Sequence, residues 1–299
     1  MSHTRWHPAR RLPTSPAYNE KSECLSQAKL CGMIEILRHL GAGTRVLDLG
    51  ALTGSFPAEY CPGAVVVRVD LELPAPGTCD GFVQADAGCL PFPDRCFDAV
   101  IANHSLGHIR GLSAALGEIG RVVRPDGSLF VAVPDASTFS DRLFRWIYQE
   151  DSGHINPFCS SDALAAGITN ATGLKLSASR ALYSSFEYLN RYYFPARSSW
   201  RLRAVGNGNR RCIVALSYAA RLFDRVFHTR ASAYGWAFYF GNVREQVEQE
   251  SWSNVCVGCG AGHSAPWLQI SNLVRRRWLI FQAYSCPACG SRNLFTRDK

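Results

Sequence analysis

The chain has 299 residues, of which 47% are hydrophobic, and a formal net charge of +8, so it can bury the core of one large domain with a smaller one beside it. No apolar run reaches the roughly 18 to 20 uncharged residues that a membrane-spanning helix needs, and the first residues, MSHTRWHPARRLP, include no hydrophobic segment. We therefore expect a cytoplasmic protein without a membrane span.

Charge and cysteine content narrow the partner classes further. The arginines are scattered, which favours a solvated basic surface over a nucleic-acid patch, although the excess permits a phosphate-bearing partner. Twelve cysteines without an export signal do not predict a disulfide framework. Eight are dispersed and are expected to be small buried hydrophobic residues, namely Cys24, Cys31, Cys61, Cys79, Cys89, Cys96, Cys159 and Cys212.

The first half of the chain predicts a parallel sheet. A helix is expected over residues 22–40, with Gly41 and Gly43 as its stop. Apolar runs then predict strands over 45–50, 64–72, 82–87, 97–106 and 127–135, with a helix over about 111–122 before the last. Because these runs are continuous rather than alternating, they are typical of strands covered on both faces, and the fold class is α/β.

The second half predicts two more strands with helices between them. Helices are expected over 139–149 and 162–173, strands over 174–183 and 233–242, and helical segments over 199–205 and 211–227. The two strands can complete the sheet, one of them as an antiparallel edge strand. The polar stretch 245–252 separates a last segment, so we expect a lead-in and helix over 1–43, a main domain over 44–245 and a small domain over 252–299.

The turn after the first strand has the features of a cofactor loop. Gly50 and Gly54 bracket it in VLDLGALTGSF, and Asp70 ends the next strand 70 − 50 = 20 residues beyond Gly50. Ligands of such sheets bind outside the carboxyl ends of the strands, where glycine lets the main chain approach the ligand and an acid accepts hydrogen bonds from the ribose. The turn is not the G-x-G-x-x-G sequence of dinucleotide-binding proteins.

Four motifs carry a resemblance to a known family. VLDLGALTG, VVRVD, QADAGCLPFPDRCFDAVIANHSLGHI and EIGRVVRPDGSLFVAVP occur in this order. They resemble the successive motifs of class I S-adenosylmethionine-dependent methyltransferases, closely over 44–135 and more weakly to about 243. The resemblance implies a Rossmann-like doubly wound, mostly parallel sheet and S-adenosyl-L-methionine as the cofactor.

Carried over to this sequence, the resemblance assigns roles to the first two strand ends. Asp48 would orient the methionine amino group, through water. Gly50 and Gly54 would let the main chain pass beneath the cofactor, and Asp70 would hold the ribose. The family usually has glycine where this chain has Leu52, so this side chain either points away from the cofactor or fills part of its pocket.

The resemblance also assigns roles beyond the third and fourth strands. Asp86 would accept a hydrogen bond from the adenine amino group, the Ala87 amide would meet the adenine ring, and Asn103 would lie beside the methionine group. Gly107 departs from the family, which often has an acid between the two histidines that flank this position.

Three histidines are candidates for a general base. His104 and His108 follow the fourth strand, and His154 lies in the later loop GHINPF above the same end of the sheet. Methyl transfer is a direct displacement that needs an aligned nucleophile and, where that nucleophile carries a proton, one base. The alternatives are that His104 packs structurally, that His108 begins a helix and that His154 ties the loop by a hydrogen bond.

The sequence narrows the acceptor only in part. NHSL replaces the Asn/Asp-Pro-Pro-aromatic sequence that stacks an exocyclic base amine, so an oxygen or nitrogen of a small molecule, a sugar or glycan, or a lipid headgroup is favoured. A methyltransferase-like binding or scaffold protein without turnover, and an RNA methyltransferase, remain as alternatives.

Four cysteines form a separate constellation. Two C-x-x-C-G units contribute Cys256, Cys259, Cys286 and Cys289, with 286 − 259 − 1 = 26 residues between the units. Two such knuckles supply four thiolates for a tetrahedral Zn²⁺, with glycine at the position of positive φ, and the intervening residues have room for a β-hairpin. We therefore predict a zinc ribbon, with His263 as a bystander and with protein or RNA contacts through Arg275, Arg276 and Arg277 as one role.

Overall fold

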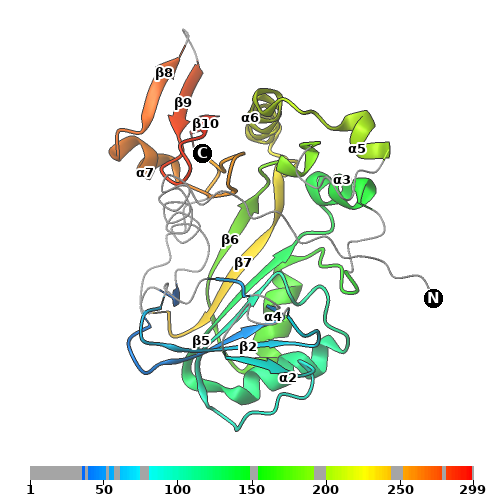
Figure 1. Cartoon of the computed structure of the whole chain (residues 1–299), viewed down its shortest axis with the longest axis vertical. Helices are drawn as coiled ribbons and strands as arrows, with labels where there is room; N and C mark the ends of the chain where they lie inside the picture. The colour runs from blue at the N-terminus through cyan, green and yellow to red at the C-terminus, as the bar shows by residue number, and fades with distance from the viewer. Residues whose placement is uncertain are drawn as a thin grey trace, which may run out of the picture.

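A seven-stranded sheet forms the body of the protein in the computed structural model (Figure 1). The strands lie in the order β3-β2-β1-β4-β5-β7-β6. Their bounds are β1 Arg45–Leu49, β2 Val65–Asp70, β3 Phe82–Gln84, β4 Phe97–Asn103, β5 Val123–Pro134, β6 Leu176–Tyr183 and β7 Ala233–Gly241. The structure describes residues 36–37, 40–51, 54–56, 61–74, 81–148, 154–191, 200–243, 252–277 and 281–297.

The strand order reverses between β1 and β4, as in the Rossmann-like doubly wound α/β fold. β1 to β5 pair in parallel, whereas β7 runs antiparallel to both β5 and β6. The expected antiparallel pairing therefore lies at this edge of the sheet. The reversed strand is β7, which is inserted one position inside the edge, and β6 forms the edge itself.

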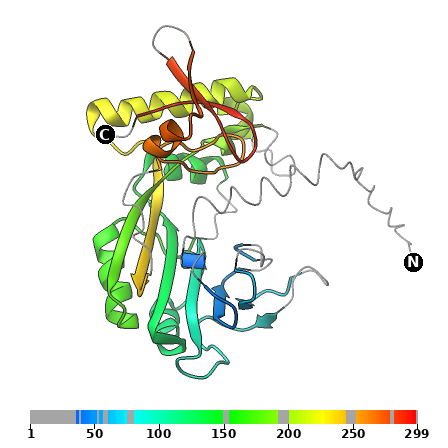
Figure 2. The same ribbon diagram turned by 90° about the vertical axis from the view of Figure 1, so that its left-hand side faces the viewer.

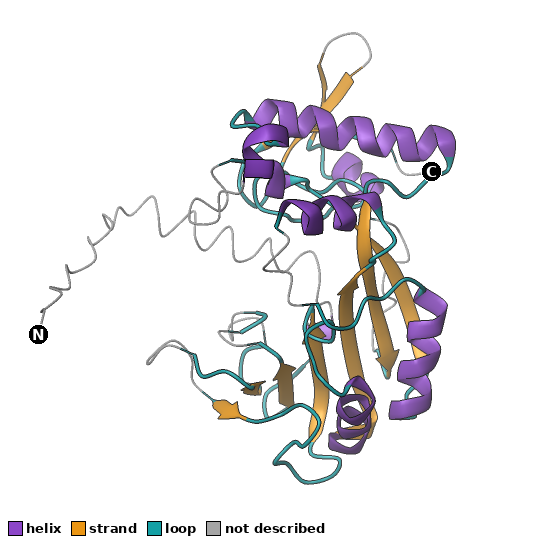
Figure 3. Cartoon of the chain, turned by 90° about the vertical axis from the view of Figure 1, so that its right-hand side faces the viewer, coloured by secondary structure: helices purple, strands orange, loops and turns teal. Residues whose placement is uncertain are grey.

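The two faces of the sheet bury separate apolar clusters. Helices α2 (Leu112–Val122) and α4 (Ser161–Thr172) pack together against one face (Figure 3). Ile119 and Ile168 of these helices meet Leu47 of β1 in one cluster, while Val46 belongs to the cluster on the opposite face. Both faces of β1 are thus buried, which explains its continuous apolar run.

Two strand boundaries differ from the prediction. β4 ends at Asn103 rather than at residue 106, because His104 takes a positive φ of 57° that a strand cannot continue through. β5 begins at Val123, which pairs with Phe97, and residues 124–127 then bulge before the pairing resumes at Ser128. Because this bulge interrupts the pairing, the apolar run in the sequence predicted the strand only from Gly127 onward.

A helical layer lies beyond the carboxyl ends of β5 and β6. It consists of α3 (Phe139–Ile147), a short 3-10 helix (Glu187–Leu189), α5 (Trp200–Val205) and α6 (Arg210–Phe227). Its apolar cluster includes Ile147, Phe186 and Ile213.

A small three-stranded sheet, in the order β10-β9-β8, forms the last part of the chain. This last part of the chain comprises α7 (Ala265–Ile270) and the three strands β8 (Val274–Arg277), β9 (Phe281–Ser285) and β10 (Arg292–Leu294). The antiparallel β8–β9 hairpin between the two cysteine pairs confirms the predicted one. This unit lies beside α6 (Figure 2), and Val257 joins the apolar cluster of the helical layer.

Several expectations are corrected or fall outside the described residues. Cys61 and Cys96 are buried as predicted, but Cys89, Cys159 and Cys212 are exposed, since each lies in a loop or on an outward helix face. The predicted helix up to residue 35, Leu52 and most of 245–252 lie outside the described residues. Within the described ranges no helix combines the length and apolarity needed to cross a bilayer.

Candidate functional site

A cleft of about 640 Å³ opens at the carboxyl ends of β1, β2 and β3 and the loop after β4. This is the switch point of the strand order, where ligands of this fold class bind. The cleft is lined by Leu49, Gly50, Val69, Asp70, Leu71, Ala85, Asp86, Ala87, Ser105, His108, Ile109, Arg110 and Ile155. The mixture of apolar walls with a few acidic and polar groups is typical of a small-molecule site.

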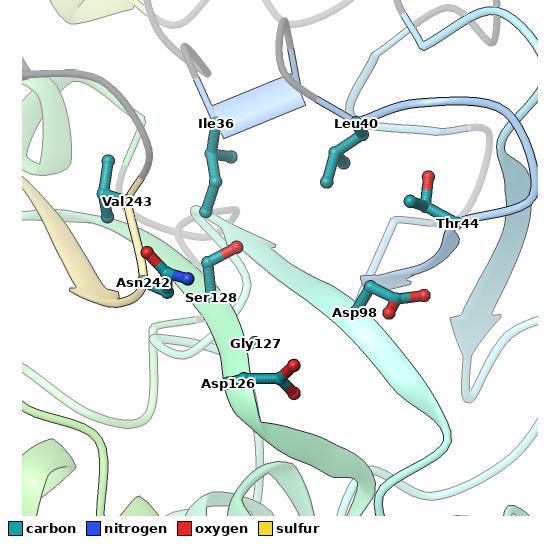
Figure 4. Close-up of a pocket in the computed structure, with 9 residues that line it drawn as sticks. All are labelled: Ile36, Leu40, Thr44, Asp98, Asp126, Gly127, Ser128, Asn242 and Val243. Carbon is teal, nitrogen blue, oxygen red and sulfur yellow. The ribbon is translucent and has the colours of Figure 1, made fainter.

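A second, smaller cavity lies at the opposite end of the strands, beside the amino ends of β1 and β4 (Figure 4). It measures about 80 Å³ and contains the carboxylates of Asp98 and Asp126. The guanidinium of Arg124 contacts both carboxylates, and the amide of Arg45 donates to Asp98. These charges are paired within the protein, so the cavity has a structural explanation and is not the candidate site.

The turn after β1 strongly favours glycine at its first position. Gly50 has a φ of 68°, and a Cβ at this residue would lie 2.4 Å from Cβ of Ser105. The amide of Gly50 donates to the carbonyl of Val69, which holds the turn against the end of β2. Gly54, with a φ of 107°, is constrained in the same way by the guanidinium of Arg68. Bare main chain therefore forms this wall of the cleft.

Asp48 lies fully buried beneath the turn, and its two oxygen atoms differ in their contacts. Its Oδ2 accepts a 2.8 Å hydrogen bond from the amide of Ser55, whereas Oδ1 has no hydrogen-bond partner among the described residues. Burial raises the pKa of Asp48, against the hydrogen bonds from Ser55 and the charge of Arg68, which act to lower it. A buried acceptor without a donor is costly unless a ligand or a water supplies one.

Two further acids face the cleft from neighbouring strand ends. Asp70 is the last residue of β2, and its Oδ1 accepts from the amide of Glu72 at 3.1 Å. Asp86 follows β3, and its Oδ1 accepts from the amide of Gly88 at 2.8 Å. Each carboxylate is therefore oriented by its own loop. Ala87 lines the cleft next to Asp86.

A single arginine holds the loop that follows these residues. The Arg121 guanidinium in α2 donates to the carbonyls of Leu90 and Phe92 and to Asp94, and it also pairs with Glu118. Glu118 in turn accepts from the amide of Leu90 at 2.7 Å. The acids and the arginine of the central sequence motifs thus serve to fix the loop between β3 and β4.

The three candidate histidines lie together beside the cleft. The ring centroids of His108 and His154 are 4.3 Å apart. Gly107 makes this approach possible, because a Cβ there would lie 2.6 Å from Cδ2 of His154. The amides of Ile155 and Asn156 both donate to the carbonyl of Gly107. This contact explains why the chain has glycine where the resembling enzymes often have an acid.

His104 has a different environment from the other two histidines. Its Nε2 lies 3.2 Å from the hydroxyl of Tyr234. Burial, together with the neighbouring His154 and His108, lowers the pKa of His104 to about 4. His104 is therefore neutral at pH 7, which suits a hydrogen-bonding role better than that of a proton acceptor.

The candidate residues divide into those that line the cleft and those that support it. Gly50, Asp70, Asp86, Ala87 and His108 line the cleft. The remaining candidates, which do not line it, are Asp48, Gly54, Asn103, His104 and His154.

Asn103 resembles Asp48 in having a buried oxygen, Oδ1, for which the described part of the chain provides no hydrogen-bond partner. The alternative of a helix beginning at His108 is wrong, because His108 is exposed in a turn and α2 begins at Leu112.

Sequence reasoning did not identify several lining residues, including Ser105, Arg110 and the apolar Ile109 and Ile155. Ile109 and Ile155 each directly follow a candidate histidine, a signal that was available in the sequence. Ser105 likewise follows the candidate His104, and its approach to Gly50 places it beside the turn after β1.

The cysteine quartet converges as predicted. The four sulfur atoms of Cys256, Cys259, Cys286 and Cys289 all lie within 4.8 Å of one another. Gly260 and Gly290, which follow the second cysteine of each pair, have φ values of 75° and 69°. Their amides donate to the carbonyls of Cys256 and Cys286. Both predicted knuckles are therefore present, and four thiol groups at these distances are suited to one tetrahedral ion.

Outer contacts orient the sulfur atoms. The neighbouring thiols of Cys259 and Cys286, together with the Gly258 amide and Nδ2 of Asn293, lower the pKa of Cys256. His263 is buried with Nε2 3.6 Å from Sγ of Cys286, so it contacts the quartet without being one of the four converging groups. Such contacts are typical of the surroundings of a structural metal site.

Part of the chain is similar in sequence to known proteins. Residues 23–178 match a family described as a methyltransferase domain. The chain belongs to this family. It is 39% identical over 116 residues to a demethylmenaquinone methyltransferase of Mycolicibacterium paratuberculosis, a match that covers 37% of this chain and 50% of the relative. A demethylmenaquinone methyltransferase of Thermus thermophilus is 39% identical over 103 residues, which cover 30% of this chain and 47% of the relative.

The methyltransferase-family chain thus spans about half the length of the curated relatives it matches. Among solved structures, the YcgJ protein of Bacillus subtilis superposes with a TM-score of 0.45 at 18% identity, over 75% of this chain and 100% of that one.

Proposed function

We propose that the protein transfers a methyl group from S-adenosyl-L-methionine to a small molecule. The observation that carries this proposal is the cleft at the switch point, where bare main chain at Gly50 meets the oriented carboxylates of Asp70 and Asp86. The family match supports the same reaction class.

The residues of the cleft fit the cofactor on their own geometry. A volume of about 640 Å³ falls within the ~300–1,000 Å³ of small-molecule sites. Asp70 would accept from the ribose and Asp86 from the adenine amino group, with the Ala87 amide beside the ring. Asp48 Oδ1 and Asn103 Oδ1, which lack partners within the described ranges, would accept from the methionine part. When bound, the sulfonium supplies an activated methyl group.

The acceptor would lie beside the histidine cluster. His108 is the exposed histidine in the cleft, so it is the one that a bound acceptor can reach and the candidate base for an oxygen or nitrogen nucleophile. His154 would position the His108 ring, and His104 would position the Tyr234 hydroxyl. The named relatives are demethylmenaquinone methyltransferases. Their name favours a small molecule over a glycan or a macromolecule as the acceptor and adds a quinone ring to the acceptor classes.

Calorimetric titration with S-adenosyl-L-methionine tests the proposal. An Asp70→Ala variant should bind about 10- to 100-fold more weakly, since a hydrogen bond to a charged group contributes roughly 1.5–3 kcal/mol. Glu72→Ala, which removes an exposed acid two residues away, should leave affinity unchanged. Absence of binding heat in the folded wild-type protein would reject the proposal, and so would equal affinity of the two variants.

We further propose that the cysteine quartet binds a structural Zn²⁺. The converging sulfurs and the two glycine-relieved knuckles support this. Protein or RNA contact through this ribbon stays a prediction, because the side chains of Arg276 and Arg277 lie outside the described residues. The alternative of a protein without turnover depended on Leu52 and Gly107. Leu52 also lies outside the described residues, and the contact with His154 accounts for Gly107.

A further inference from the structure

Helix α6 turns its apolar side outward. At about 100° per residue, one continuous arc of roughly 140° on this 18-residue helix carries no charged side chain. Phe223 and Phe227 on this arc are 49% and 62% exposed. The arc, here called the α6 arc, comprises eight exposed residues, namely Cys212, Ala215, Leu216, Ala219, Leu222, Phe223, Val226 and Phe227.

Polar contacts on the opposite side fix this orientation. Ser217 Oγ donates to the carbonyl of Ser185 at 2.8 Å, and Arg221 Nη2 donates to the carbonyl of Ser184 at 3.0 Å. The Asp224 carboxylate accepts four hydrogen bonds from the segment that leads into β7. Rotating the helix to bury the α6 arc would break all of these contacts and bury unpaired polar groups, which is unfavourable. The arc is therefore held toward solvent.

The exposed charges of residues 200–230 have one sign. Residues 200–230 contain seven arginines and one acid, Asp224. Asp224 is only 8% exposed and is engaged in hydrogen bonds, whereas Arg203, Arg211 and Arg225 are exposed. Between Trp200 and Arg230 the surface thus combines a broad apolar face with a cationic margin.

This combination selects among the possible occupants of the arc. A two-fold pairing of α6 with a second copy would bring the arginine margins of both copies together, which is unfavourable. A nucleic acid would neutralise the arginines but leave the apolar face uncovered. An anionic bilayer meets both requirements, because the apolar side chains enter the acyl boundary and the arginines meet lipid phosphates.

We propose that α6 docks the protein on an anionic lipid bilayer, with the helix lying in the plane of the membrane surface. Two exposed tryptophans of the same helical layer support this, since tryptophan favours the membrane interface. Trp146 and Trp200 lie with ring centroids 6.4 Å apart and are 39% and 63% exposed. The proposal does not depend on the methyltransferase activity.

The layer that contains α6 lies at the end of the sheet where the cleft opens. β6 is parallel to β5, and α6 follows its carboxyl end (Figures 1 and 2). Docking through α6 would therefore bring the membrane to the carboxyl-end side of the sheet.

Vesicle sedimentation with the full chain tests the proposal. The wild-type protein should sediment with vesicles of phosphatidylglycerol and phosphatidylcholine in 0.1 M salt, and much less with phosphatidylcholine alone. A Phe223→Ser/Phe227→Ser variant should lose at least about tenfold in partition coefficient. An Arg211→Gln/Arg225→Gln variant should lose about 30-fold on the anionic vesicles, from roughly 1 kcal/mol for each arginine at such a surface.

Leu176→Ser provides the matched control. Leu176 is 42% exposed, close to the exposure of Leu222 in the arc, but lies at the amino end of β6. This variant should sediment like the wild type. The proposal is overturned if the wild-type protein does not sediment with anionic vesicles. It is also overturned if the Phe223→Ser/Phe227→Ser variant binds them as well as Leu176→Ser does. It is equally overturned if sedimentation equilibrium shows a dimer that the phenylalanine substitutions dissociate, because α6 would then pair with a second copy.

Discussion

Replacing Gly50 by alanine should damage the cofactor turn through a specific contact. The positive φ of 68° costs a residue with a Cβ about 1–2 kcal/mol. The new Cβ would also lie 2.4 Å from Cβ of Ser105, more than 1 Å inside the ordinary contact of about 3.5–4.0 Å. Overpacking of this kind costs about 1–3 kcal/mol. Either the free energy of unfolding falls by the sum of these costs, roughly 2–5 kcal/mol, or the turn changes its geometry to avoid them.

Two further variants separate strain from collision. Gly173 has a nearly equal φ of 72° with nothing within 4 Å of its added Cβ, so Gly173→Ala should show the strain alone. In Gly50→Ala/Ser105→Gly the nearest remaining atom of residue 105 is its Cα, at 3.6 Å, so the collision is relieved.

Urea unfolding and titration with S-adenosyl-L-methionine measure both effects. Gly50→Ala should weaken binding about tenfold or more, Gly173→Ala should not, and the double variant should recover most of the loss. If Gly50→Ala unfolds and binds like Gly173→Ala, the turn does not approach Ser105 and the reasoning is wrong.

Three other predictions concern pH, metal and the supporting loop. Folding lowers the pKa of His104 from 6.5 to about 4, so between these pH values the unfolded chain binds one more proton than the folded protein. The free energy of unfolding should therefore fall as the pH drops from 6.5 to 4. His104→Asn, in which asparagine tolerates the positive φ, should reduce this pH dependence in urea unfolding. Elemental analysis should find one zinc per chain, none in Cys259→Ser, and one in the exposed-cysteine control Cys159→Ser; zinc in all three would refute the site. Arg121→Met should lower the unfolding free energy by about 2 kcal/mol by leaving two carbonyls without donors. Arg124→Met, whose partners are the exposed Asp126 and the partly exposed Asp98, should scarcely change the midpoint. Equal effects of the two substitutions would contradict the loop assignment.

The sequence was most informative where one residue type is the only solution. Gly50, Gly260 and Gly290 were recognised from their motifs, and each has the positive φ that explains it. The continuous apolar runs likewise predicted the parallel strands, because a strand buried on both faces has no polar side. The spacing alone predicted that the four cysteines converge, because each C-x-x-C pair is closed by its own tight turn.

Features that depend on contacts between distant segments could not be predicted. The reason for Gly107 is the ring of His154, which is 47 residues away in the chain (154 − 107). The placement of β7 between β5 and β6 depends on pairing across the whole helical layer. The amphipathic pattern of α6 was visible, but the pattern alone suggests an inward apolar face; only the bonds of Ser217 and Asp224 show that this face points outward.

A crystal structure of the protein with S-adenosyl-L-methionine tests the central claim most directly. The account predicts the adenosyl group in the cleft above Gly50, with the ribose hydroxyls on Asp70 and the adenine amino group on Asp86. An adenosyl group bound elsewhere on the chain, or a cleft closed to it at saturating concentration, would contradict it.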